Sequence, residues 1–498
     1  MTEKTHTTER APVIAIMGHI DHGKSTLLAY IRKSTQPLNE AGGITQHVSA
    51  YEVEHESSDG KTHKITFIDT PGHEAFSGIR RRGANVADIA ILVVSAEDGV
   101  KPQTIEALKS ITDSKTPYIV AINKIDKPEA NIERTKQSLA ENEIYIEGYG
   151  GDIPVVSLSS KTGEGIPELL DMILLVAEMQ ELTTDTTAHG SGVVIESNRD
   201  VKKGITATCI IKNGTIKKGE FIAAGESTAP VRIMENYLGS QMNEMSASSP
   251  VRIIGWDSLP IVGSPFHTYV TRTEAEGYVT EEKEHRAVKT NATFDPNTYA
   301  VPVIIKADAG GSLEAVLYEI KKLTSDRVRV DVVSASIGAI SDSDIQLACA
   351  SKNAIVIGFN TKIDSSARNL AERQEIEIQT FNIIYKLSEW LADVLVNRTP
   401  KIQTKESTGR AKILKTFSKI KDRQIIGARV ESGVIKLGGL VTIMRRDAEI
   451  GEGKIKELQQ QKNRSDEVAE GKECGAMIEA KVELAPGDYI ESFIIVEK

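Results

Sequence analysis

Short runs of β-branched and other apolar residues alternate with helical patterns over residues 11 to about 182. The runs at 13–17, 64–68, 89–94, 117–122 and 153–158 predict strands, and helical spacing lies between most of them. This alternation is typical of a mostly parallel sheet covered by helices. In such sheets ligands bind at the carboxyl ends of the strands.

The pattern changes near Ala188 to short apolar runs separated by glycine, which predicts a closed β-barrel. Similar texture returns near the end of the chain, and residues 211–219 and 430–438 carry Gly, Ile, Lys and Gly at identical offsets. The 219-residue separation, 430 − 211, is too long for a solenoid period, so we interpret the pair as two copies of one barrel module. The alternative is a glycine turn common to many β proteins.

Between the barrels, Glu274 to Arg286 is charged and polar, which indicates a linker or a solvated helix. Strands are predicted at 302–307, 328–335, 354–359 and 376–380, and Ser341 with Asp344 has the spacing of a helix N-cap pair. This segment has no phosphate loop, metal spacing or nucleophile-base pair and is interpreted as a spacer. Residues 382–397 then predict a helix that joins the spacer to the last barrel. Its apolar face comprises Ile383, Ile384, Leu387, Trp390, Leu391 and Leu395.

Composition sets outer bounds on this picture. The 498 residues suggest three or four domains, and the net charge of −10 does not indicate nucleic-acid binding by itself. Cys209, Cys349 and Cys474 lie far apart without C-x-x-C spacing, which excludes a disulfide framework and disfavours a zinc site. The first ten residues lack the apolar core of a signal peptide, and the apolar runs are too short to span a membrane. We therefore expect a soluble, cytoplasmic protein.

Residues 18–25 read G-H-I-D-H-G-K-S after the first strand and before a helix that begins near Lys24. In this phosphate-binding pattern Gly18 and Gly23 let backbone N–H groups point at phosphate oxygens. Lys24 would reach the β- and γ-phosphates, and the Ser25 hydroxyl would ligate Mg²⁺. The predicted phosphate-binding residues are Gly18, His19, Asp21, His22, Gly23, Lys24, Ser25, Thr26 and Gly72.

Two further motifs follow strands of the same series. Asp69 in D-T-P-G-H can hold Mg²⁺ through water, although D-T-P-G alone is often an ordinary turn. In N-K-I-D a buried Asp126 carboxylate can accept both the N1–H and the N2–H₂ of guanine, which favours GTP over ATP. N-K-x-D alone is more often a strand-ending turn. The predicted guanine-binding residues are Asn123, Lys124, Asp126, Ser159, Ser160 and Lys161.

These motifs together resemble bacterial-type translation initiation factor two, a translational GTPase family. The similarity includes A-G-G-I-T-Q-H (41–47), D-T-P-G-H-E-A-F (69–76), N-K-I-D-K-P (123–128), I-I-K-A-D-A-G-G-S-L-E-A-V (304–316), I-G-A-I-S-D-S-D-I-Q-L-A (337–348), I-V-I-G-F-N (355–360) and G-K-E-C-G (471–475). The family's long amino-terminal region is absent from this sequence.

The resemblance implies roles for individual positions. Thr45 would close over Mg²⁺ and the γ-phosphate, His73 would orient the attacking water, and Ile20 and Ile44 would form an apolar gate that His73 must pass. Asp21 would contribute to phosphate-loop electrostatics, and Ser160 stands where the family usually has Ala. Glu473, Cys474 and Gly475 match the pocket for the formylated methionine of initiator tRNA. Ala428 and Gln459-Gln460-Gln461 depart from that pocket's usual cysteine and Lys-Arg-aromatic stretch.

The expected fold is multidomain α/β plus β-barrels. Its predicted parts are a disordered amino terminus (1–10), a P-loop GTPase domain (11–182), a β-barrel (183–272), a linker (273–300), an αβα spacer domain (301–381), a connecting helix (382–404) and a carboxyl-terminal β-barrel that binds initiator tRNA (405–498). Residues 401–423 contain eight Lys/Arg against Glu406 and Asp422, a net of +6 that suits a nucleic-acid backbone. A charge run of this kind is more often a solvated face.

The resemblance implies a translation initiation factor with GTP/GDP and Mg²⁺ as ligands. It would promote binding of formylmethionyl initiator tRNA to the small ribosomal subunit and joining of the large subunit. GTP hydrolysis would follow on the ribosome, with ribosomal RNA as a further partner, no membrane, and a monomer off the ribosome. Alternatives are an elongation-type tRNA carrier, which the spacer and G-K-E-C-G speak against, and a scaffold that binds GTP without hydrolysing it. A nucleotide kinase would need a phosphoacceptor site, and none is visible.

Overall fold

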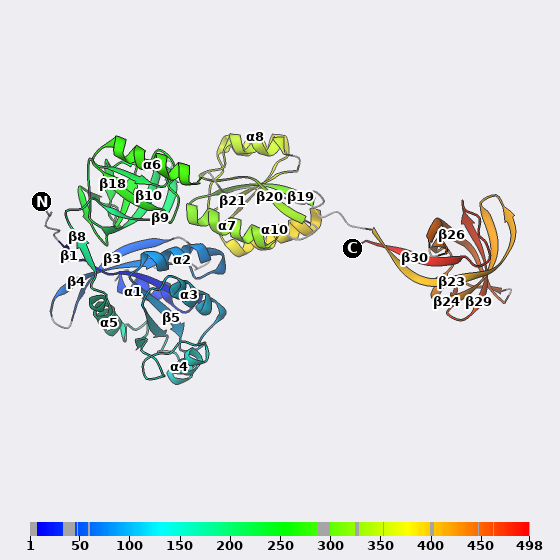
Figure 1. The fold of residues 1–498 in the computed structure, drawn as a ribbon, viewed down its shortest axis with the longest axis horizontal. Coiled ribbons are helices and arrows are strands. Elements are labelled where there is room, and N and C mark those ends of the chain that lie inside the picture. Colours follow the sequence, from blue (N-terminus) through cyan, green and yellow to red (C-terminus); the bar gives the residue numbers. More distant parts are fainter. Residues whose placement is uncertain are drawn as a thin grey trace. The chain divides into compact units, whose positions relative to one another are not determined.

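The computed structural model describes residues 7–32, 45–46, 48–57, 60–200, 202–286, 299–323, 328–351, 353–398, 403–446, 448–461 and 463–497. It forms two compact units, Met1–Arg398 and Thr399–Lys498, which are considered separately (Figure 1). Within the described residues no helix is both long enough and apolar enough to cross a membrane.

The first domain of the larger unit is a six-stranded sheet in the order β3-β4-β2-β5-β6-β7, in which only β3 runs antiparallel to its neighbour. Its elements are β2 (Val13–Gly18), α1 (Lys24–Ile31), β3 (Ser49–Glu56), β4 (Thr62–Asp69), the 3-10 helix η2 (Glu74–Phe76), α2 (Ser77–Val86), β5 (Ile89–Ser95), α3 (Pro102–Asp113), β6 (Tyr118–Asn123), α4 (Ile132–Glu141), β7 (Val155–Ser157) and α5 (Ile166–Met179). All residues of β2 and β5 are buried, because helices cover both faces of a parallel sheet. The predicted mostly parallel sheet is confirmed.

The second domain is an antiparallel sheet that curls around a buried core containing Cys209, Trp256 and Phe266. Its order is β13-β12-β18-β9-β10-β17-β14-β15, with β11-β16 and β1-β8 as separate ladders. The strands are β1 (Thr7–Glu9), β8 (Thr183–Asp185), β9 (Ser191–Asp200), β10 (Gly204–Asn213), β11 (Thr215–Lys217), β12 (Phe221–Ala224), β13 (Ser227–Pro230), β14 (Ile233–Glu235), β15 (Gln241–Met242), β16 (Glu244–Ser246), β17 (Pro250–Ile254) and β18 (Pro265–Tyr269). The pairing of β1 with β8 corrects the expectation of disorder for residues 7–9, while residues 1–6 lie outside the described part.

Helix α6 (Arg272–Arg286) occupies the first part of the segment expected to be a linker. Its Ala275 and Val279 are buried against Phe221 and Ala223 of β12, so one face of the charged helix packs on the barrel-like sheet. A buried ion cluster joins this sheet to the first domain. Both oxygens of Asp88 accept bonds from Arg10, at 2.6 and 2.7 Å, and Lys212 of β10 lies 2.6 Å from the same carboxylate.

The spacer is a parallel four-stranded sheet in the order β20-β19-β21-β22. Its elements are β19 (Tyr299–Ala307), α7 (Gly310–Lys322), β20 (Val328–Ile337), α8 (Asp342–Ala350), β21 (Ile355–Phe359), α9 (Ser365–Gln374), β22 (Glu377–Phe381) and α10 (Ile384–Arg398). Ser341 and Asp344 form the expected capping box of α8. The apolar face of α10, carrying Leu387 and Leu391, packs into the spacer core together with Phe76 of η2.

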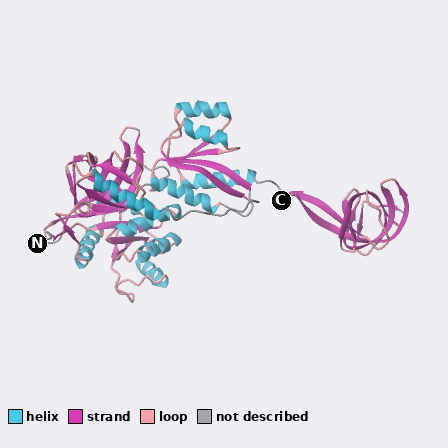
Figure 2. Ribbon diagram, turned by 45° about the horizontal axis from the view of Figure 1, so that its top comes forward, coloured by secondary structure: helices cyan, strands magenta, loops and turns pink. Residues whose placement is uncertain are grey.

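The smaller unit consists of strands alone among its described residues (Figure 2). These are β23 (Gln403–Ile420), β24 (Arg423–Lys436), β25 (Leu440–Arg445), β26 (Ala448–Gln460), β27 (Asn463–Arg464), β28 (Glu467–Ala469), β29 (Glu473–Ala480) and β30 (Tyr489–Glu497). The order β23-β30-β25-β26-β29-β24 closes because β24 also pairs with β23, so this barrel is a complete ring.

The repeated segment has the same local geometry in both units. Gly214 and Gly433 have φ of +76° and +70°, and a Cβ on either would lie 2.4 or 2.3 Å from the backbone oxygen of His189 or Thr408. After each glycine a short stretch pairs with a strand about thirty residues later, β11 with β16 and the end of β24 with β28. The shared turn and shared pairing support duplication of one module.

Candidate nucleotide-binding site

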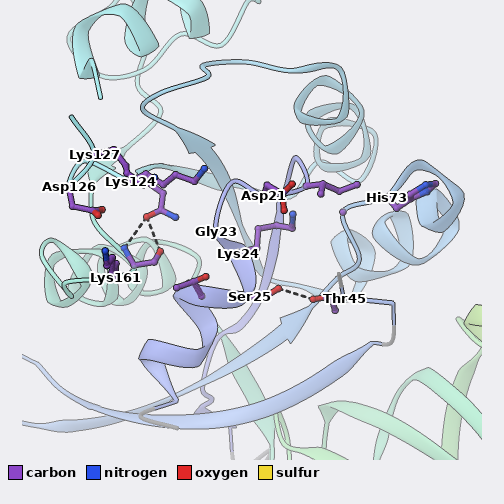
Figure 3. Close-up of a pocket in the computed structure, with 15 residues that line it drawn as sticks. Asp21, Gly23, Lys24, Ser25, Thr45, His73, Lys124, Asp126, Lys127 and Lys161 are labelled. Carbon is purple, nitrogen blue, oxygen red and sulfur yellow. Dashed lines mark hydrogen bonds between the residues drawn. The ribbon is translucent and has the colours of Figure 1, made fainter. Parts of the chain in front are cut away.

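A cavity of about 330 Å³ lies where β2, β4 and β6 end (Figure 3). It is lined by Ile20, Asp21, Gly23, Lys24, Ser25, Thr26, Thr45, Gly72, His73, Asn123, Lys124, Asp126, Lys127, Ser160 and Lys161. The structure therefore brings together residues that the sequence predicts from motifs more than one hundred positions apart. Of these lining residues only Lys127 was not predicted.

The phosphate loop is held by close contacts that only glycine permits. Gly23 has φ +89°, and a Cβ there would lie 2.3 Å from Asn123 Nδ2. Gly72 approaches from the other side, since its Cβ would lie 2.7 Å from Lys24 Nζ. Lys24 is 6% exposed and donates to His19 O at 2.6 Å, and burial lowers its pKa to about 8 while the Asp69 carboxylate opposes this shift. The loop thus places an ammonium group at the cavity floor.

The two predicted histidines of the loop turn their side chains away from the cavity. His22 is 1% exposed and its Nδ1 accepts from Ser95 N at 3.3 Å, while burial lowers its pKa to about 3. The His19 ring packs edge-on against it at 4.9 Å. Burial lowers the pKa of His19 as well, and neither ring lines the cavity.

Of the three side chains predicted to hold a divalent cation, Ser25 and Thr45 line the cavity and Asp69 does not. Ser25 Oγ and Thr45 Oγ1 are 2.8 Å apart, joined by a dashed line in Figure 3, and Asp69 ends β4 fully buried. Hydroxyl and carboxylate oxygens are ligands that suit Mg²⁺, which usually keeps waters and phosphate oxygens as well. The donor set therefore fits the predicted metal.

The guanine side of the cavity is organised by Asn123 at the end of β6. Its Nδ2 donates to His22 O at 2.8 Å, and its Oδ1 accepts from Ser160 N and Ser160 Oγ at 2.9 and 2.8 Å. One buried amide thereby connects the phosphate loop to the third guanine element. Lys124, at φ +66°, lies 3.2 Å from Glu97.

Asp126 is exposed, so the expectation of a buried carboxylate is wrong. Ser159 Oγ donates to Asp126 Oδ1 at 2.6 Å, and this bond lowers the pKa of the carboxyl group. The same Ser159 Oγ accepts from Lys161 N and Thr162 N. Ser159 does not line the cavity, but it fixes the orientation of the residue predicted to bind guanine.

His73 lies at the far end of the site with its ring pointing away from Lys24 and Ser25 (Figure 3). It is 6% exposed, its Nδ1 accepts from Ala75 N at 2.8 Å as the cap of η2, and its ring lies 4.0 Å from that of Tyr385. Burial lowers its pKa to about 4. Ile20 Cγ1 lies 3.4 Å from a Cβ placed on Gly72, whereas Ile44 lies outside the described residues.

The predicted initiator-tRNA residues in the carboxyl-terminal barrel do not share one surface. Cys474 is in the core opposite Ala428, and burial raises its pKa to about 11. Glu473 and Gly475 face outward on either side of it. Gly475 pairs with Gly427 and with the exposed Gln459, so the floor of the outer face here is bare at the two glycines and carries the Gln459 side chain beside them. Phe417, 61% exposed, lies 3.5 Å from a Cβ placed on Gly427.

Sequence reasoning missed Lys127, Tyr385 and Phe417. The N-K-I-D-K-P motif offered a signal for Lys127, which follows the guanine element directly. No sequence pattern indicated Tyr385, because its contact partner His73 is more than three hundred residues away in the chain. Phe417 stands inside the basic 401–423 run, where an aromatic residue among cations could have indicated base stacking.

Comparison with known proteins agrees with this arrangement. Residues 9–179 match the family "Elongation factor Tu GTP binding domain", residues 189–269 match "Elongation factor G domain 2" and residues 278–392 match "Translation-initiation factor 2". The fold and the cavity thus define a GTP-binding domain of the translation-factor class, followed by a second domain of the same class.

Full-length relatives specify the family. The chain is 40% identical to translation initiation factor IF-2 of Halothermothrix orenii over 97% of this chain and 72% of the relative. It is 41% identical to the factor of the same name from a Nitratiruptor species, over 100% of this chain and 60% of the relative. The chain belongs to the translation initiation factor IF-2 family. It spans 60%, 58% and 48% of the Nitratiruptor, Campylobacter jejuni and Caulobacter relatives.

Among solved structures, the crystal structure of GDP-bound aIF5B from Aeropyrum pernix is 28% identical, with a TM-score of 0.48. The similarity covers 97% of this chain and 92% of that one.

Proposed function

We propose that this chain is a GTP-dependent switch of translation initiation that hydrolyses GTP to GDP and phosphate when stimulated by the ribosome. The observation that carries the proposal is the single cavity in which the phosphate loop, Thr45 and Asp126 meet. In this cavity guanine would bind at Asp126, and the terminal phosphate would bind at Lys24 and Gly72. A water would attack the γ-phosphorus, and the bond to the β-phosphate oxygen would break to release GDP.

Each residue of the site would have a separate role in GTP binding or hydrolysis. Lys24 would bind the β- and γ-phosphates, and Ser25, Thr45 and, through water, Asp69 would hold Mg²⁺, which neutralises phosphate charge when bound. His73 would orient the water. Its pKa near 4 keeps the imidazole neutral at physiological pH, and its Nε2 is buried and has no hydrogen-bond partner. Because Nδ1 accepts from Ala75 N, the neutral ring carries its proton on Nε2, which can donate a hydrogen bond to the oxygen of the water once the ring turns past Ile20.

We further propose that formylmethionyl initiator tRNA binds the carboxyl-terminal barrel, and that the small and large ribosomal subunits and their RNA are the other partners. Support comes from the outward floor at Gly427 and Gly475, flanked by the exposed Phe417 ring and the basic 401–423 run. Exposed aromatic rings stack on bases, and lysines bind phosphates. With Gln459-Gln460-Gln461 lacking both cations and an aromatic ring, we expect weaker binding of the tRNA than in other members of the family. We propose a monomer off the ribosome.

Ribosome pelleting tests this proposal. The chain, with labelled formylmethionyl initiator tRNA, is sedimented with small subunits in a non-hydrolysable GTP analogue or in GDP, and GTP turnover is measured after large subunits are added. We expect co-sedimentation of the tRNA in the analogue alone and His73-dependent turnover. Retention of elongator tRNA in place of initiator tRNA would favour an elongation-type carrier. Binding of GTP without any stimulated turnover would favour a non-hydrolysing scaffold.

A further inference from the structure

The start of α10 contacts both sides of the γ-phosphate end of the cavity. The Tyr385 ring lies 4.0 Å from the His73 ring, centroid to centroid, at an interplanar angle of 61°. Asn382 O, just before the helix, accepts a hydrogen bond from Gln46 Nε2 at 2.9 Å. Gln46 is 2% exposed and follows Thr45, whose hydroxyl bonds Ser25. The helix start therefore contacts the segments that carry Thr45 and His73.

Tyr385 is not needed for the packing of α10. The helix is anchored by the fully buried Ile384, Leu387 and Leu391, whereas Tyr385 is 42% exposed and lies outside that stripe. Its ring contact is with His73, the last residue before η2. Tyr385 therefore lies outside the packing face of α10 and against the His73 ring, where it can restrict the movement of that ring.

The other hydrogen bonds and ring contacts of His73 with described residues come from η2 and α2. Ala75 N donates to its Nδ1 at 2.8 Å, and the edge-on Phe76 ring lies 6.1 Å away. Arg80 donates to the backbone oxygen of His73 and leaves its ring unrestrained. Among the described residues Tyr385 is the nearest aromatic neighbour of His73, with its ring at 4.0 Å against 6.1 Å for Phe76.

We infer that Tyr385 is a positioning residue that holds the His73 ring away from the nucleotide and so keeps GTP hydrolysis slow until α10 is displaced. The inference rests on the proposed role of His73 in hydrolysis. Displacement of the helix start would release His73 and break the Gln46 bond at the same time. The two halves of the site would therefore be freed together.

The expected gain follows from the size of one aromatic contact. Edge-to-face pairs bias an equilibrium between two positions by roughly three- to tenfold. Loss of the Tyr385 ring should therefore raise unstimulated hydrolysis by about three- to tenfold, since a larger fraction of the chains would have His73 free to enter the cavity. Tyr385→Phe keeps the ring and should change little.

The experiment measures single-turnover GTP hydrolysis by the full chain without ribosomes. The variants are Tyr385→Ala, Tyr385→Phe, His73→Ala and the double variant, with Tyr385→Leu as a second truncation if the alanine variant is unstable. Tyr278→Ala is a matched control, because it removes a tyrosine ring that lies 5.6 Å from His267, in the barrel-like domain. We expect a faster rate in Tyr385→Ala alone, and the double variant should return to the rate of His73→Ala.

A second readout reports the His73 ring itself. Its pKa, followed by NMR, should rise from about 4 toward the ordinary histidine value in Tyr385→Ala, because burial is the main cause of its depression. The charged groups that face His73 are Glu319 and Lys322 of α7, Arg80 of α2 and Glu74, and all remain in the variant. The ring should then be hydrated more freely.

The outcomes separate this inference from the proposed function. If Tyr385→Ala raises the pKa of His73 but leaves the unstimulated rate unchanged or lowers it, Tyr385 does not restrain hydrolysis. An unchanged pKa together with an unchanged rate would mean that the contact does not hold His73, which also overturns the inference. If His73→Ala retains the full ribosome-stimulated rate, the proposed role of His73 fails instead.

Discussion

Replacement of Asn123 by alanine tests whether the guanine and phosphate halves of the site form one unit. The side chain is 1% exposed and makes three hydrogen bonds, one to His22 O and two from Ser160. Each intramolecular hydrogen bond contributes about 1 kcal/mol net, so the three together contribute about 3 kcal/mol. If this energy organises the loops for the ligand, GDP affinity should fall roughly 100-fold.

Isothermal calorimetry with GDP measures the effect directly. Asn142→Ala is the matched control, since it removes one amide bond, Nδ2 to Ser138 O at 2.8 Å, at the end of α4. Thermal unfolding without nucleotide shows whether the domain stays folded at the titration temperature. A GDP affinity within about threefold of the unsubstituted chain, in a folded variant, would refute the argument that this amide organises the cavity.

Three other predictions concern separate parts of the chain. Asp126→Asn should shift the preference of the site from guanine to xanthine nucleotides, because an amide donor complements the C2 carbonyl of xanthine. The prediction is contradicted if, in the unsubstituted chain, ATP displaces bound GDP as effectively as GTP does in a competition assay. Arg445 donates a hydrogen bond to Asp488 at 2.7 Å and lowers the pKa of that carboxyl group. The ionised pair therefore stabilises the fold above the ordinary carboxyl pKa, and this stabilisation is lost as pH falls through the lowered pKa of Asp488. Asp488→Asn should thus lower the melting temperature of the carboxyl-terminal unit by about 5 °C at neutral pH. Below about pH 4 the melting temperature of the variant should fall less steeply with pH than that of the unsubstituted chain, as measured by scanning calorimetry. Phe417→Ala should weaken binding of initiator tRNA to the full chain about tenfold at every salt concentration, whereas Lys415→Ala should mainly reduce the salt dependence; equal effects on deacylated tRNA would mean that Phe417 does not contact the aminoacylated end.

Much of the fold and of the cavity could be predicted because local patterns specify them. Strands such as β5 are continuous apolar runs, and the phosphate loop needs glycine at particular positions for reasons that operate within a few residues. The failures have a different origin. Whether Cys474 points into the barrel or out of it depends on strand register, and register is set by pairing with Ala428 forty-six positions away, 474 − 428.

Contacts between segments far apart in the sequence could not be predicted from local patterns either. The polar composition of α6 predicted a solvated or linking segment, yet Ala275 and Val279 are enough to seat one face of it on β12. The contact of Tyr385 with His73 depends on how the spacer packs against η2, and no periodicity in either segment reports it. Asp126 is exposed, and a four-residue motif does not encode the burial of its residues.

The closure of the carboxyl-terminal barrel has a consequence for how the chain is assembled. Gln403, the first residue of β23, pairs with Glu497, the last residue of β30, so the first and last described strands of the unit begin and end side by side. A module whose two ends meet can be joined to a chain through one short connection, without any strand threading through its neighbours. This geometry also means that a probe attached at the end of β30 would report on the start of β23.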